Sequence, residues 1–148
     1  MIRPGAGKLP GQRFVLDSHA LMAFLEGEAS GEIVEALLEQ ALDNGCGLYM
    51  SVVNLGEVIY ITERERGLAK AQQVLARIDE LPIKVIDADR RCSLAAAHIK
   101  AHWPIAYADC YAAALCQVTD AVLVTGDPEF VPLEAAGTVT VHWLVRPG

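Results

Sequence analysis

Four acidic residues interrupt segments that are otherwise apolar: Asp17 in FVLDSHALMAF, Glu57 in SVVNLGEVIY, Asp109 in IAYADCYAAAL and Asp127 in VLVTGDPEF. None of these segments contains a lysine or arginine that would neutralise the carboxylate. Like charges that lie close together raise each other's pKa and cost stability unless a counter-ion is present. Carboxylate oxygens and water suit Mg²⁺ or Mn²⁺, so the four residues predict a divalent cation site if the fold brings them together.

Each carboxylate, taken singly, is better explained by its place at the start of a helix. Asp17 and Asp127 directly follow apolar runs and are placed to cap the next helix. Asn54 and Glu57 have nearly the spacing of a capping box. Asp109 falls in the first helical turn, where the helix dipole favours a negative charge. The choice between caps and a cation site therefore depends on where the fold places the four residues.

Short apolar runs alternate along the chain with longer segments of helical periodicity. The predicted strands are Phe14–Leu16, Leu48–Val52, Ile83–Ile86, Val122–Thr125 and Val139–Leu144. Most are nearly continuous in Val, Ile and Leu, which is typical of strands covered on both faces. Asn44-Gly45 and Gly67 predict breaks between helices. The alternation predicts a three-layer α/β/α single domain with a central parallel sheet of about five strands.

This architecture predicts that the carboxylates meet. In a parallel α/β sheet, a helix that follows a strand begins at the strand's carboxyl end, and ligands bind along that edge where the strand order reverses. Asp17, Glu57 and Asp127 are therefore expected on one rim of the sheet. Asp109, on the helix leading into the fourth strand, joins them if that helix has the right rotation.

Length and charge narrow the class of protein. The chain has 148 residues, which suits one domain, and we expect residues 1–12 to form a flexible tail and residues 13–148 to form the domain. The formal net charge of −7 disfavours a simple nucleic-acid-binding module, because phosphate binding normally relies on Lys and Arg. The negative charge is weaker evidence against an enzyme whose carboxylates are masked by divalent ions.

Cysteine spacing and hydropathy give two further expectations. The cysteines at positions 46, 92, 110 and 116 form no CxxC pair and no zinc spacing, so they are predicted to be reduced core residues. No apolar run reaches the roughly 18 residues of a membrane span, and MIRPGAGKLPGQR lacks the apolar stretch of a signal peptide. We therefore expect a cytoplasmic protein that does not engage a membrane.

Four short motifs resemble, in order, the acidic motifs of PIN-domain proteins. They are Val15-Leu16-Asp17 followed by Ala20-Leu21, Asn54-Leu55-Gly56-Glu57, Ala108-Asp109, and Thr125-Gly126-Asp127. The size and single-domain build resemble the VapC-type toxins of bacterial and archaeal toxin–antitoxin pairs. The resemblance implies a ribonuclease that depends on Mg²⁺ or Mn²⁺ and leaves a 5′-phosphate and a 3′-hydroxyl on its RNA products.

The resemblance also implies roles for particular side chains. Asp17, Asp109 and Asp127 are the best candidates for direct or water-mediated metal ligands. Glu57 is expected either to ligate or to orient the attacking water as a base. Hydrogen bonds that hold the carboxylates are expected from Ser18, Asn54 and Thr125. The chain departs from many relatives at Ser18-His19, where they carry two small hydroxyl residues.

Substrate-binding residues are less well defined. Arg64 and Arg66 are the candidates for RNA contacts, with the alternative that Glu63 and Glu65 neutralise them on a solvated helix. The first two helices offer more apolar positions than one buried face needs. A homodimer or an amphipathic antitoxin segment laid in a groove would cover them.

Three other functions share parts of this sequence pattern. A PIN-fold nuclease in RNA processing, outside any toxin–antitoxin pair, would have the same site. A catalytically inert PIN-fold scaffold is disfavoured because all four acidic residues are present. A phosphatase of the haloacid dehalogenase type needs a second aspartate two positions after the first, where this chain has His19.

Overall fold

The computed structural model describes residues 11–147. The strands are β1 (Gln12–Leu16), β2 (Cys46–Ser51), β3 (Lys84–Ile86), β4 (Val122–Thr125) and β5 (Val141–Trp143). The α-helices are α1 (Ser18–Leu25), α2 (Glu32–Leu42), α3 (Val52–Arg66), α4 (Leu68–Asp79), α5 (Arg90–His102), α6 (Tyr107–Thr119) and α7 (Val131–Ala135). Two 3₁₀ turns, η1 (Ala29–Gly31) and η2 (Pro128–Phe130), complete the described elements.

The five strands form one parallel sheet in the order β3-β2-β1-β4-β5. The chain builds outward from β1 to β3 on one side and then returns to place β4 and β5 on the other. The strand order therefore reverses between β1 and β4, which is where α/β sheets open a crevice for ligands. The predicted α/β class, single domain and central parallel sheet are confirmed.

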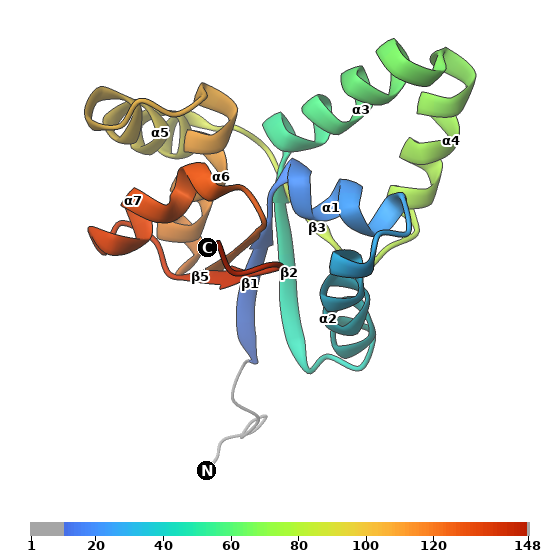
Figure 1. The fold of residues 1–148 in the computed structure, drawn as a ribbon, viewed down its shortest axis with the longest axis horizontal. Coiled ribbons are helices and arrows are strands. Elements are labelled where there is room, and N and C mark those ends of the chain that lie inside the picture. The colour runs from blue at the N-terminus through green and yellow to red at the C-terminus, as the bar shows by residue number, and fades with distance from the viewer. Residues whose placement is uncertain (1–10, 148) are drawn as a thin grey trace.

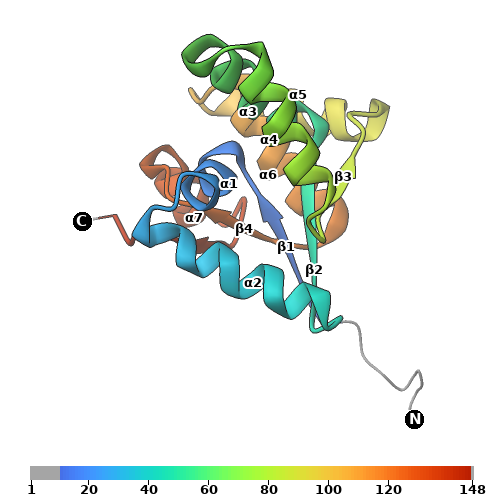
Figure 2. The same ribbon diagram turned by 90° about the vertical axis from the view of Figure 1, so that its right-hand side faces the viewer.

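Helices cover both faces of the sheet (Figure 1). One face carries α5, α6 and α7, and the other carries α1 and α2, with α3 and α4 extending beyond α1 (Figure 2). The strands supply both cores by alternation, since Val15 and Leu123 pack toward α5 and α6 whereas Phe14, Leu16 and Val124 pack toward α1 and α2. This two-sided burial explains the continuous apolar runs of the sequence.

Some predicted boundaries are wrong. Val52 was predicted to end a strand but is the first residue of α3, because the Ser51 hydroxyl caps that helix by accepting a hydrogen bond from the Val53 amide at 3.1 Å. Asn54 and Glu57 therefore do not form a capping box. The first and second strands begin earlier than predicted, at Gln12 and Cys46, and the last is shorter at both ends.

The predicted helix breaks and the predicted state of the cysteines are confirmed. Gly67, with φ of 91°, separates α3 from α4, and Asn44, with φ of 58°, follows the end of α2. The four cysteines are free and buried. No helix in residues 11–147 is long and apolar enough to cross a membrane. Residues 1–10 of the predicted tail lie outside the described residues. Gln12, the last residue of that predicted tail, is the first residue of β1.

Candidate metal centre

The register of β1 and β4 places Asp17 beside Thr125. Leu16 pairs with Val124, so the next residue of each segment, Asp17 after β1 and Thr125 at the end of β4, lies at the carboxyl edge of the sheet. The Thr125 hydroxyl donates to Asp17 Oδ2 at 2.5 Å and accepts from the Asp127 amide at 3.0 Å. Asp17 Oδ1 accepts from the Ala20 amide at 2.8 Å. One buried hydroxyl therefore connects the Asp17 carboxylate to the backbone of Asp127.

Asp17 and Asp127 are also helix caps, as predicted. Asp17 is the N-cap of α1, and Asp127 caps η2 by accepting from the Glu129 amide at 2.9 Å, with Pro128 following it. A cap turns a carboxylate toward the start of its helix. Because both helices start at the carboxyl edge of the sheet, capping itself brings these two side chains to one rim.

Glu57 approaches the same rim from the beginning of α3. Its Oε1 accepts a hydrogen bond of 2.5 Å from the Ser18 hydroxyl in the first turn of α1. Glu57 is partly buried, whereas Asp17 is 1% exposed. The first turn of α1 therefore contacts the carboxylate that α3 supplies.

Asp109 lies in the first turn of α6, which packs across β1, β2 and β4. Asn54 was predicted to hold a carboxylate, but its side-chain amide instead donates to the Ala108 carbonyl at 3.1 Å. This bond ties α3 to the start of α6 just before Asp109. Asn54 is fully buried, and its Oδ1 atom has no hydrogen-bond partner.

The four carboxylates form one electrostatic cluster. Burial raises the pKa of Asp17 to about 7, and the charges of Asp127 and Glu57 act in the same direction, against the hydrogen bonds from Thr125 and Ala20. The pKa of Asp109 is also raised to about 7, mainly by burial. The charges of Asp127, Asp17 and Glu57 raise it further.

Sequence reasoning missed one member of the neighbourhood, Glu129. Its charge contributes to the raised pKa of Asp109, and it lies two residues after Asp127 in VTGDPEF. A second acidic residue close behind a predicted site aspartate was the signal that could have found it.

The chemistry of the cluster fits a hard divalent cation. Its donors are all oxygen atoms, and the only ion pair in residues 11–147 joins Arg146 to Glu134, so none of the four carboxylates is neutralised by a basic side chain. The unpaired Asn54 Oδ1 is a further buried oxygen acceptor on the helix that carries Glu57. Within the described residues, however, no three His, Cys, Asp or Glu side chains converge as a metal-holding group. A cation would therefore require side-chain rotation toward a common point.

The raised pKa values predict how the metal-free protein responds to pH. Asp17 and Asp109 each have a pKa of about 7 in the folded protein, against an ordinary value of 3.8. The folded state therefore loses stability relative to the unfolded state as the pH rises from about 4 to about 7. We expect the melting temperature in EDTA to fall between pH 5 and pH 8, by an amount that for Asp17 corresponds to a few kcal/mol. Thermal denaturation across this range measures it, and Mg²⁺ should restore more stability at pH 8 than at pH 5. A melting temperature that rises with pH would contradict the electrostatic description of the cluster.

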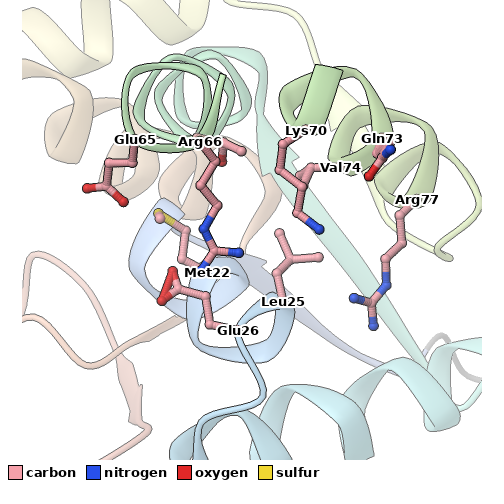
Figure 3. A pocket seen from close by; sticks show the side chains of 10 residues that line it. Met22, Leu25, Glu26, Glu65, Arg66, Lys70, Gln73, Val74 and Arg77 are labelled. Carbon is pink, nitrogen blue, oxygen red and sulfur yellow. The ribbon is translucent and has the colours of Figure 1, made fainter. Parts of the chain in front are cut away.

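A separate cavity of about 260 Å³ lies between α1, α3 and α4 (Figure 3). Arg66, Lys70 and Arg77 point from α3 and α4 toward Leu25 and its neighbours on α1. Arg64 and Arg66 were the two predicted substrate contacts. Arg66 lines this cavity, whereas the Arg64 guanidinium lies over the Tyr60 ring, 5.2 Å from its centroid. None of the four carboxylates lines this cavity, so it is distinct from the cluster.

Comparisons with known proteins agree with the fold. A family model described as PIN domain matches residues 14–134. The VapBC2 structure from Rickettsia felis, bound to a promoter DNA fragment, superposes with a TM-score of 0.70 at 15% identity, over 89% of this chain and 98% of that one. The DNA-bound VapBC from Salmonella typhimurium gives 0.69 at 16% identity, over 90% and 99%. VapC20 from Mycobacterium tuberculosis, described as a sarcin-ricin loop cleaving toxin, gives 0.62 at 19% identity, over 90% and 99%. None of the curated proteins compared with the chain matches it.

Proposed function

The chain belongs to the PIN domain family, and from this membership we propose that it is a metal-dependent ribonuclease of the VapC toxin type, which hydrolyses RNA phosphodiester bonds. The observation that carries the proposal is that Asp17, Glu57, Asp109 and Asp127 lie near enough to one another, where the strand order reverses, for the charges of the others to raise the pKa of Asp109. The similarity to the toxin structures, among them one described as a sarcin-ricin loop cleaving toxin, supports the choice of substrate.

The proposed division of labour follows from the contacts of each side chain. Asp17, Asp109 and Asp127 would hold Mg²⁺ or Mn²⁺. The bound ion would supply positive charge that offsets the charge developing on the phosphoryl oxygens. Glu57, held by Ser18, would orient the attacking water and accept its proton.

Hydrogen bonds around these carboxylates would maintain their orientation. Thr125 links Asp17 to the Asp127 backbone, and Asn54 links α3 to the residue before Asp109. Such supporting bonds set the direction from which an oxygen approaches a cation.

The direct test is cleavage of total RNA by the purified chain with Mg²⁺, Mn²⁺ or EDTA. We expect cleavage with either ion and none in EDTA, and end-labelling should detect a 5′-phosphate on the products. Persistent absence of cleavage with both ions and a panel of structured RNAs would favour an inert scaffold. Cleavage that continues in EDTA would remove the metal from the mechanism.

We also propose an antitoxin partner, supported by the VapBC complexes among the similar structures. Its docking segment would occupy the cavity between α1, α3 and α4. The apolar side chains of Met22, Leu25 and Val74 lie there, and three basic residues outnumber the two acidic ones, Glu26 and Glu65. An amphipathic segment with acidic side chains matches this combination. A homodimer, which light scattering would detect, is proposed as well.

Charge reversal at Arg77 tests the partner site. Arg77→Glu should abolish co-purification with a candidate antitoxin encoded by the neighbouring gene, because it places a like charge against the acidic segment. RNA cleavage by the isolated chain should remain, since Arg77 lies outside the carboxylate cluster. Arg91→Glu makes the same charge change at an exposed position of α5 that does not line the cavity, and it should leave the complex intact. Retained binding by Arg77→Glu would place the partner elsewhere.

A further inference from the structure

His19 contacts the backbone between two residues of the carboxylate cluster. A Cβ atom placed on Gly126 would lie 2.6 Å from Cε1, 3.1 Å from Nδ1 and 3.5 Å from Nε2 of the His19 ring. The ring edge that carries both nitrogens therefore faces Gly126. Gly126 precedes Asp127 and follows Thr125, so the imidazole lies against the turn that presents both.

Close approach, rather than backbone conformation, explains the glycine. Gly126 is not among the glycines with positive φ, which are Gly27, Gly67 and Gly137. Its φ is one that any residue could adopt, but a methyl group there would overlap the imidazole and displace it, because the ring is the exposed end of a flexible side chain. Glycine at position 126 is thus matched to histidine at position 19.

The contact completes a pattern in the first turn of α1. Asp17 accepts from Thr125, Ser18 donates to Glu57, and His19 packs on Gly126. Three successive residues thus touch β4, α3 and the turn that follows β4. His19 is exposed on its remaining side, so the hydrophobic core does not explain its position.

From this geometry we infer that His19 is a positioning residue, which holds the Thr125–Asp127 turn so that the Asp127 carboxylate faces Asp17 and Asp109. The inference rests on the proposed function, because it assigns His19 a task in the same cation site. The action is through packing of the planar ring, with no proton transfer. Residues that orient ligands from outside the coordination sphere typically change metal affinity or activity by about 10- to 100-fold.

A double-mutant cycle tests the inference. Mn²⁺ affinity is measured by calorimetry on wild type, His19→Ala, Gly126→Ala and the double variant, together with kcat and KM for RNA cleavage. We expect each single variant to weaken Mn²⁺ binding about tenfold and to lower kcat with little change in KM. The double variant should bind no more weakly than Gly126→Ala, because the added methyl group then occupies space that the ring has left.

Two further variants separate packing from other roles. His19→Phe keeps a planar ring and should retain Mn²⁺ affinity within a few-fold of wild type, as in other shape-conserving replacements. Gly56→Ala is the matched glycine control, because a Cβ atom there would meet nothing within 4 Å. It should bind Mn²⁺ like wild type.

The inference is overturned if His19→Ala binds Mn²⁺ as tightly as wild type, if the two single losses simply multiply, or if only KM changes. A change in KM alone would make His19 a substrate contact instead. Failure of the proposed function is distinguishable: wild type that binds Mn²⁺ without cleaving RNA overturns the ribonuclease and leaves the binding cycle to decide the role of His19. Wild type that binds no Mn²⁺ overturns both.

Discussion

Replacing Asp17 with asparagine is expected to lower the rate of RNA cleavage by at least about 1,000-fold, more than the roughly 10- to 100-fold typical of residues that only support a ligand. The change removes a negative charge from the most buried member of the cluster. It keeps the side-chain shape, and asparagine caps helices as well as aspartate does. The start of α1 should therefore remain intact, with the amide oxygen accepting from Ala20 and the amide nitrogen facing Thr125.

The same variant should be more heat-stable than wild type in EDTA at pH 8. Ionised Asp17 is buried near Asp127 and Glu57, and the neutral amide removes both its burial penalty and their repulsion. Asp79→Asn makes the same chemical change at an exposed position in α4 and should alter neither activity nor stability. Full activity in Asp17→Asn, or lower stability with normal helix content, would contradict the role of Asp17.

Replacing Phe130 with alanine is expected to produce the largest loss of stability, about 3–5 kcal/mol, which lowers the melting temperature of a domain of this size by roughly 10 °C. Phe130 is fully buried in the core between the sheet and α5, α6 and α7. Its removal leaves a cavity that the surrounding strands and helices cannot fill without moving.

Phe130 also anchors the segment that carries Asp127. Its amide donates to the Asp127 carbonyl at 3.2 Å, within the 3₁₀ turn that Asp127 caps. We therefore expect Phe130→Ala to weaken Mn²⁺ binding even at temperatures where the protein is folded. The adjacent residue supplies a control, since Val131 is 41% exposed and Val131→Ala should change stability by less than about 1 kcal/mol. Equal effects of the two substitutions in chemical denaturation would show that this segment is not held by the core.

Several contacts of the proposed site could not have been read from the sequence. The spacing of Asn54 and Glu57 suggested a capping box, yet Ser51 caps α3 and Asn54 turns instead to the Ala108 carbonyl, 54 residues away. The contact of His19 with Gly126 likewise joins residues that no local pattern relates. Local preferences predicted that these segments would be helix or loop but did not predict which long-range partner each side chain would find.

By itself the sequence determined the alternation of buried strands and helices, and with it the α/β class and the parallel sheet. Those features follow from local rules: apolar runs form covered strands, and Asp17 and Asp127 cap what comes next. The tertiary structure alone decided the order β3-β2-β1-β4-β5. It thereby decided that Asp17 lies beside Thr125, and that Asp109 lies near enough to Asp127 and Asp17 for their charges to raise its pKa. The physical reason is that strand order and helix rotation depend on how whole faces pack against each other, and this packing energy is shared among residues far apart in the chain.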